Sequence, residues 1–158
     1  MYLAGNAHPE LAFPVHQCAR FTHSPRHSHT TAIKRIGRYL NGIIDKDQGL
    51  IFTPTTELNQ ECYVDADFAA MWGYADVQDP ICVWSQSGYV MTLGGCPIHW
   101  TSKMQTKVAL STTEAEYIAL AQSFWEFIPM HRAFEDMILA FNLTTEFPIT
   151  VKSTIFED

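Results

Sequence analysis

Apolar side chains recur at helical spacing in three segments of the chain, and this pattern predicts three helices. The first spans residues 9–22, where Pro14 would cost about 3 kcal/mol or force a kink. The second spans residues 28–41, and Gly42 is placed to end it. The residues expected to face inward in the second helix are Ile33, Ile36, Gly37 and Leu40.

The third predicted helix is the longest, from near Thr112 to near Ala140. Ser111 can accept the backbone N–H of Glu114, and the Glu114 carboxylate can reach back to the N–H of Ser111, which is the pattern of a capping box. Pro129 lies inside this helix and should bend it. Its inward-facing positions should be Tyr117, Leu120, Ala121, Phe124 and Ile128.

Short segments rich in β-branched and aromatic residues predict the strands. Those in the middle of the chain follow one another closely and can pair as an antiparallel meander. The last strand is reached through the long helix, so it should lie parallel to the first of them after a right-handed crossover. The predicted strands are residues 49–53, 61–68, 87–93, 98–102 and 149–156.

These elements predict a mixed α/β (α+β) fold. The chain should be divided into two parts. Residues 1–55 should form a helical segment, and residues 56–158 a domain built on a mixed sheet, with the boundary near residue 55. The chain has 158 residues and is 47% hydrophobic, which is enough for a real core.

Several classes of protein are disfavoured by the composition. No run of 18 apolar residues is present, so we expect no membrane span. The first residues lack the basic start and apolar core of a signal peptide. The four cysteines have no CxxC spacing, which argues against a zinc knuckle and favours a reduced, intracellular chain over a disulfide framework.

The net charge of −7 is unevenly distributed. Residues 1–40 carry five Lys/Arg against one acid, or +4, while residues 41–158 carry five against sixteen, or −11. The basic front, with Lys34, Arg35 and Arg38, could contact phosphates. The alternative is that these residues form an ordinary solvated helical face.

Three acidic residues stand out from the rest of this acidic region. Asp65 lies near the end of the first mixed-sheet strand, Glu116 one turn into the long helix, and Asp158 just beyond the last strand. If the two strands are parallel neighbours, Asp65 and Asp158 emerge at the same sheet edge. Carboxylates suit Mg²⁺ or Mn²⁺, and two such ions can support phosphodiester cleavage. The alternative is that the three acids are separate surface residues.

Several longer stretches resemble the ribonuclease H region of copia-type retrotransposon polyproteins. The N-terminal stretches resemble the end of the reverse transcriptase that precedes it. The motifs occur in the family's order and cover essentially the whole chain. They are residues 2–4, 7–13, 29–40, 63–69, 87–90, 93–106 and 109–120.

The resemblance implies a ribonuclease H fold and Mg²⁺-dependent cleavage of the RNA strand of RNA–DNA hybrids. It makes Asp65, Glu116 and Asp158 the metal ligands of a site that takes two Mg²⁺ or Mn²⁺ ions. The partners it implies are the hybrid and the polymerase and integrase parts of the polyprotein, in a cytoplasmic particle or the nucleus. The residues expected to contact nucleic acid are Lys34, Arg35, Arg38 and Lys103.

The chain departs from the family at its end, because a fourth family acid follows the fourth strand and this sequence stops at Asp158. We therefore expect an incomplete ribonuclease H-like domain with weak or no activity. Two alternatives stay open. One is a non-catalytic module that binds nucleic acid or protein, and the other is a translated pseudogene without a selected function.

Overall fold

The computed structural model describes residues 2–46, 49–53, 58–69, 72, 80–142 and 152–157. Its helices are α1 (Tyr2–Asn6), α2 (Ala12–Ala19), α3 (His27–Ile43) and α4 (Thr112–Ala140). Its strands are β1 (Asn59–Asp67), β2 (Gln86–Leu93), β3 (Cys96–Met104) and β4 (Lys152–Glu157). Short 3₁₀ turns cover Pro9–Leu11, Ile44–Lys46 and Pro80–Val83.

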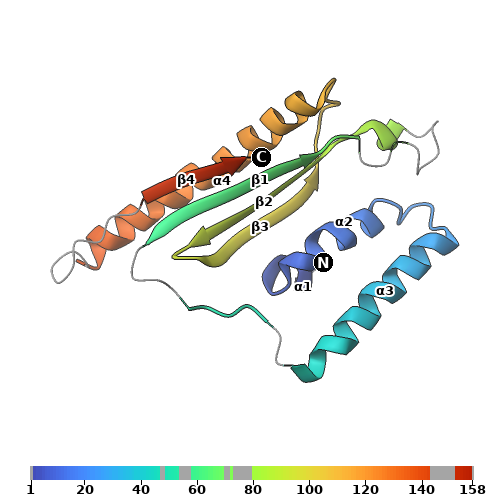
Figure 1. The fold of residues 1–158 in the computed structure, drawn as a ribbon, viewed down its shortest axis with the longest axis horizontal. Helices are drawn as coiled ribbons and strands as arrows, with labels where there is room; N and C mark the ends of the chain where they lie inside the picture. The colour runs from blue at the N-terminus through green and yellow to red at the C-terminus, as the bar shows by residue number, and fades with distance from the viewer. Residues whose placement is uncertain are drawn as a thin grey trace.

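The four strands form one mixed sheet in the order β3-β2-β1-β4 (Figure 1). β1, β2 and β3 are an antiparallel meander, and β4 runs parallel to β1. Gly94 and Gly95 make the turn between β2 and β3 with φ of 57° and 79°, a conformation that side chains disfavour. The predicted α/β class, the meander and the parallel fourth strand are confirmed.

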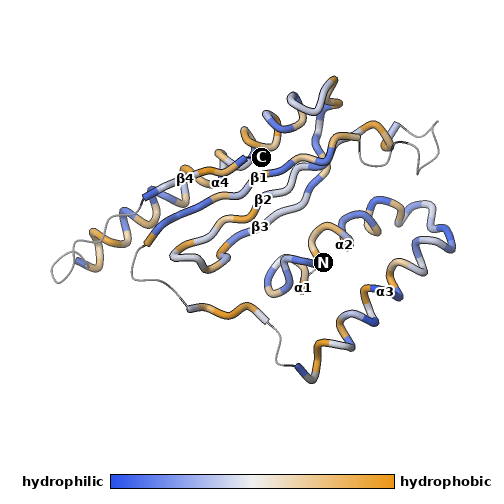
Figure 2. The backbone as a smooth tube through the Cα atoms, in the orientation of Figure 1, coloured by the Kyte–Doolittle hydropathy of each residue, from blue (hydrophilic) through white to orange (hydrophobic). Residues whose placement is uncertain are grey.

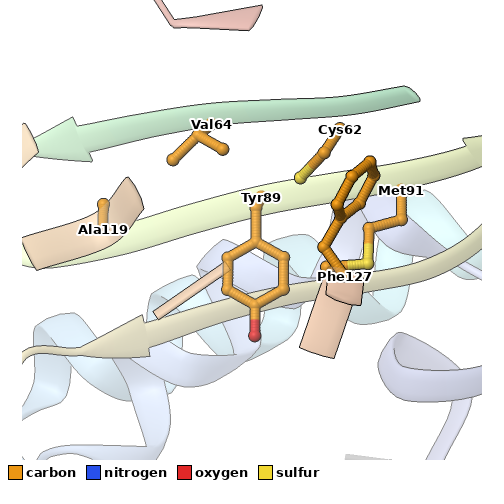
Figure 3. Close-up of a cluster of buried hydrophobic side chains, with 6 residues drawn as sticks. All are labelled: Cys62, Val64, Tyr89, Met91, Ala119 and Phe127. Atoms are coloured by element: carbon orange, nitrogen blue, oxygen red, sulfur yellow. The ribbon is translucent and has the colours of Figure 1, made fainter. Parts of the chain in front are cut away.

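The main core lies between α4 and one face of the sheet (Figure 3). α4 turns a stripe of mostly small residues toward the sheet, which lets the helix approach closely. The buried residues of this stripe are Ala115, Ala119, Ser123 and Phe127. The sheet supplies Cys62, Val64, Tyr89 and Met91 to the same core.

The predicted inward face of the long helix is therefore largely wrong in phase: Leu120 packs against the core as predicted, but Ala121 is exposed. Tyr117 is 65% exposed, and Phe124 and Ile128 are also exposed. The sheet brings its own large side chains, such as Met91 and Tyr89, so the first turns of α4 pack against it with small side chains and only Phe127 of the buried stripe is large. The bounds of the helix are confirmed, and it continues through Pro129.

One of the two hydrogen bonds predicted for the capping box of α4 is present, and the other has a different donor. The Ser111 side chain accepts the backbone N–H of Glu114 at 3.1 Å. The Glu114 carboxylate, however, accepts the N–H of Leu110 at 2.7 Å. Both bonds satisfy backbone donors at the helix start, so the cap still fixes where α4 begins.

The N-terminal helices lie on the other side of the sheet, next to β3 (Figure 1). The indole Nε1–H of Trp100 on β3 donates to the carbonyl of Ala4 at 2.6 Å. The side chain of Gln17 on α2 donates to that of Gln86 on β2 at 2.7 Å. α3 packs mainly against α2 rather than on the sheet, and its residues alternate between hydrophilic and hydrophobic (Figure 2).

Two predictions in the N-terminal part are corrected. The helix expected over residues 9–22 is divided into a 3₁₀ turn and α2, which puts Pro14 in the first turn of α2, where its missing N–H costs little. α3 continues past Gly42 to Ile43, because glycine stops a helix only where the chain turns left-handed.

Two further predictions differ from the structure. Ile33 and Gly37 are exposed, because α3 packs mainly against α2 and leaves these positions facing solvent. Residues 49–53 form no strand, since no described strand lies beside them to pair with. The expected boundary near residue 55 falls outside the described residues. No helix in the described part of the chain is long and apolar enough to cross a membrane.

Candidate functional site

Two of the three predicted acidic residues meet at one end of the sheet. Asp65 of β1 and Glu116 of α4 line the same small hollow, together with Val64 and Glu157. Asp65 comes near the end of β1, and Glu116 is in the second turn of α4. Asp158, the third predicted ligand, lies outside the described residues.

Packing and register explain how the hollow forms. Ala115, adjacent to Glu116, is fully buried and holds the first turns of α4 against the sheet. The parallel register pairs Val64 of β1 with Glu157 of β4, which places the Glu157 backbone beside the end of β1. Asp65 and Glu157 are exposed and Glu116 is half-buried, so the carboxylates are accessible to ions from solvent.

Negative charge is concentrated at this end of β1. Burial raises the pKa of the Asp67 carboxyl, and the charge of Asp65 two residues away raises the pKa further. A cation bound nearby would relieve this repulsion. The site chemistry therefore favours a cation with oxygen ligands, such as Mg²⁺ or Mn²⁺.

The described residues alone do not complete a metal centre. Within them, no three His, Cys, Asp or Glu side chains come together closely enough to hold an ion. Asp65, Glu116 and Glu157 line one hollow, which as it stands is too small to admit a water molecule. The fit to a divalent cation is thus partial in this part of the chain.

Glu157 was missed by the sequence analysis. It could have been found from the predicted parallel pairing, because a residue next to Asp158 at the end of the last strand must also reach the end of β1. Glu157 lines the hollow together with Asp65 and Glu116.

The basic residues are divided between two places. Lys103 is exposed on β3 and lies at the same end of the sheet as Asp65, in the row that runs from Ala66 through Ser87. Two strand spacings separate the β1 and β3 backbones in this row, or about 10 Å.

The charge of Lys103 also acts on α2. Burial lowers the pKa of His16 on α2, and the positive charge of Lys103 lowers that pKa further.

The other three basic candidates are on α3. Lys34, Arg35 and Arg38 are all exposed, and α3 does not pack on the sheet. They form a basic face apart from the hollow, so the structure does not bring them together with Asp65 and Glu116.

A polar network on β1, α4 and β4 was not foreseen from the sequence. The Ser153 hydroxyl lies 2.8 Å from Nδ1 of His131, and the Gln60 amide oxygen lies 3.1 Å from the same nitrogen. Nε2 of His131 is 3.4 Å from the Glu135 carboxylate. The network ties the start of β4 to α4 and to β1.

Comparison with known proteins places similar sequences in transposon polyproteins. The chain is 36% identical over 115 residues to the retrovirus-related Pol polyprotein from transposon RE2 of Arabidopsis thaliana, a match that covers 73% of this chain and 7% of the polyprotein. It is 36% identical over 137 residues to the Pol polyprotein from transposon TNT 1-94 of Nicotiana tabacum, covering 87% of this chain and 10% of the polyprotein. The chain therefore spans about a tenth or less of these polyproteins.

A third relative has a different description. The chain is 38% identical over 126 residues to secreted RxLR effector protein 161 of Plasmopara viticola, a match that covers 80% of this chain and 82% of the effector. No family model matches the chain, and no solved structure matches it either.

Proposed function

The chain belongs to the Pol polyproteins of copia-type retrotransposons, and we propose that its sheet and α4 form the part of such a polyprotein that hydrolyses the RNA strand of RNA–DNA hybrids. The observation that carries the proposal is the hollow that Asp65 and Glu116 share. These are the β1 and α4 positions at which the family resemblance expects metal ligands. The parallel β4 beside β1 further supports a ribonuclease H-like arrangement.

In this proposal Asp65, Glu116 and Asp158 hold divalent ions, Mg²⁺ or Mn²⁺. Two such ions, when bound, activate a water molecule and stabilise the leaving oxygen of a phosphodiester. Asp65 is fixed by the β1–β2 ladder and Glu116 by the cap and packing of α4. Lys103 at the same end of the sheet attracts the phosphate backbone.

We expect the activity of this chain to be low. Two closely placed ions need several carboxylates to offset their charge, and within the described residues no three such side chains come together. The ions should therefore bind weakly, and cleavage should require millimolar Mg²⁺ or Mn²⁺.

The direct test measures two quantities. Mn²⁺ binding is detected by the paramagnetic broadening that the ion causes in NMR signals, and hybrid cleavage is assayed separately. Asp65→Asn and Glu116→Gln should each weaken Mn²⁺ binding at least about tenfold, because each removes a charged ligand. Asp136→Asn, at an exposed α4 position away from the hollow, is the matched control. Unchanged Mn²⁺ binding in both hollow variants would refute the proposed site.

A second candidate function is binding without cleavage. It is favoured by the exposed basic face of Lys34, Arg35 and Arg38, which lies apart from the hollow. A nucleic-acid binder of this kind should lose affinity steeply with salt and need no divalent ion. Replacing the three residues with Gln should abolish this binding and leave Mn²⁺ binding at the hollow unchanged.

A further inference from the structure

A larger groove lies on the side of the sheet opposite α4. It has a volume of about 440 Å³ and an apolar lining, and it extends between the sheet and the N-terminal helices. Asp65 and Glu157, which also line the hollow, form part of its acidic edge. The residues that matter for its chemistry are Phe13, Tyr63, Asp65, Trp100, Phe156 and Glu157.

The groove contains a flat, accessible aromatic surface. Tyr63 and Phe156 are register partners on β1 and β4, and their rings stack with centroids 5.0 Å apart and planes 14° apart. Tyr63 is 47% exposed and Phe156 is 45% exposed. Phe13 of α2, across the groove, is 46% exposed. Three aromatic side chains are thus about half accessible in one groove.

Carboxylates surround this aromatic surface. Asp65 follows Tyr63 by two residues on the same face of β1, about 7 Å along the strand. Glu61, two residues before Tyr63, accepts a hydrogen bond from its hydroxyl at 3.0 Å. Glu157 lines the groove on β4. When no divalent ion is bound, these carboxylates repel phosphate and attract cations, which disfavours nucleic acid as the occupant of this groove.

We propose that the groove binds an arginine-bearing, basic segment of a partner protein. A guanidinium group is planar and weakly hydrated, so it stacks on the Tyr63–Phe156 surface and donates to carboxylates at the same time. A lysine ammonium is a compact, strongly hydrated charge, so it stacks on aromatic rings and donates to carboxylates at the same time less well than a guanidinium. The net charge of −7 on the whole chain adds a long-range attraction for a basic partner.

The proposal goes beyond hydrolysis and does not depend on it, because binding of the segment requires no metal. The test therefore uses the full chain in the presence of a chelator. The probes are a short synthetic peptide of alternating Arg and Ala, the same peptide with Lys for Arg, and a single-stranded RNA. Binding is followed by intrinsic tryptophan fluorescence, since Trp100 lines the groove, and by calorimetry.

The arginine peptide should bind several-fold more tightly than the lysine peptide. Tyr63→Ala and Phe156→Ala should each weaken arginine-peptide binding about tenfold, and Tyr63→Phe, which keeps the ring, should retain it. Trp125→Ala, at an exposed aromatic of α4, should leave binding unchanged. Circular dichroism and unfolding temperature of each variant separate lost binding from lost folding.

Three results would overturn the proposal. Equal binding of the arginine and lysine peptides would reduce it to non-specific attraction by an acidic surface. Arginine-peptide binding that survives Tyr63→Ala and Phe156→Ala would place the peptide elsewhere. Competition by the single-stranded RNA at the groove would identify a different occupant. None of these outcomes affects Mn²⁺ binding at the hollow, so the two proposals fail separately.

Discussion

The sheet with α4 and the N-terminal helices are held together in different ways. The first region has a continuous core in which Cys62, Met91 and Ala119 are completely buried. α2 buries none of its residues, and α3 buries only Ile43. A region that buries so little apolar surface gains little free energy of its own and depends on its attachment to the sheet.

That attachment combines a few buried apolar side chains with hydrogen bonds. Ala4, Leu11 and Trp100 are buried. The hydrogen bonds include the Trp100 indole bond to Ala4, the Gln17–Gln86 bond and, to the 3₁₀ turn before β2, a bond from the Arg20 guanidinium to the carbonyl of Ile81 at 2.8 Å. Gln86 also donates to the Ser102 hydroxyl at 2.7 Å, which extends the contact into the sheet. Hydrogen bonds fix orientation but contribute modest net free energy. The sheet with α4 should therefore resist unfolding more strongly than the N-terminal helices.

The two regions should differ most in how much free energy of unfolding each loses when one of its apolar side chains is truncated. Met91→Ala removes the largest fully buried side chain and should lower the free energy of unfolding by about 3 kcal/mol. Ile33→Ala, at a 56% exposed position of α3, should change the free energy of unfolding by less than about 0.5 kcal/mol. Urea unfolding measures both. Similar costs would mean that the two regions share one core.

A smaller effect is expected from cutting the attachment. Trp100→Phe removes the indole donor and should cost about 1–2 kcal/mol, because the Ala4 carbonyl loses its partner in a buried place. The loss should appear as faster amide hydrogen exchange in α1 and α2, with β1 and β2 unchanged. Trp125→Phe, at an 82% exposed position, is the control and should alter neither region. Faster exchange throughout the sheet would contradict a local attachment.

The start of α4 offers a test within the stronger region. Ser111→Ala removes the side-chain acceptor of the Glu114 N–H and should lower the free energy of unfolding by about 1 kcal/mol. Thr113→Ala, in the exposed first turn, should have little effect. Exchange of the Glu114 amide should accelerate only in the first variant. Equal effects from the two substitutions would show that the cap does not hold the helix start.

The smallest effect at neutral pH concerns Tyr89. Burial raises the pKa of its hydroxyl, and a hydrogen bond to Glu126 with the charge of that carboxylate raises the pKa further. The folded protein therefore keeps this proton at pH values where the unfolded chain, with a tyrosine pKa of about 10, releases it. Stability from Tyr89 is complete below pH 10 and is lost as pH rises above it.

Tyr89→Phe should thus reduce the decline in the free energy of unfolding above pH 10. Tyr63→Phe is a useful comparison, because Tyr63 is exposed and in the groove rather than in the core. Urea unfolding at several alkaline pH values measures the slope for each. An identical slope in wild type and Tyr89→Phe would exclude Tyr89 as the group responsible.

Local patterns were sufficient to predict the strands of the sheet and the position of α4. Alternation and β-branched residues marked β1 to β4 to within a few residues, and the Ser111 cap marked the start of α4. These signals depend on neighbours in the chain, which the sequence contains. The pairing of Asp65 and Glu116 was a prediction from family motifs and strand order, and both residues line one hollow.

Other features depended on partners that are distant in the sequence. The inward phase of α4 was misjudged, because Tyr117 and Phe124 formed a stronger apolar stripe than Ala115 and Ala119. Which stripe faces inward depends on the space left by Met91 and Tyr89. The role of Glu157 likewise depends on the register between β4 and β1.

The sequence by itself determined the order and type of the main elements, because local periodicity and capping fix these, and its motifs carried the resemblance to the family. Only the tertiary structure decided that small residues of α4 face the sheet and that Tyr63 stacks on Phe156 beside an acidic edge. The physical reason is that burial and register arise between segments that meet only when the chain is folded, and no local pattern records which side chains will share the same space.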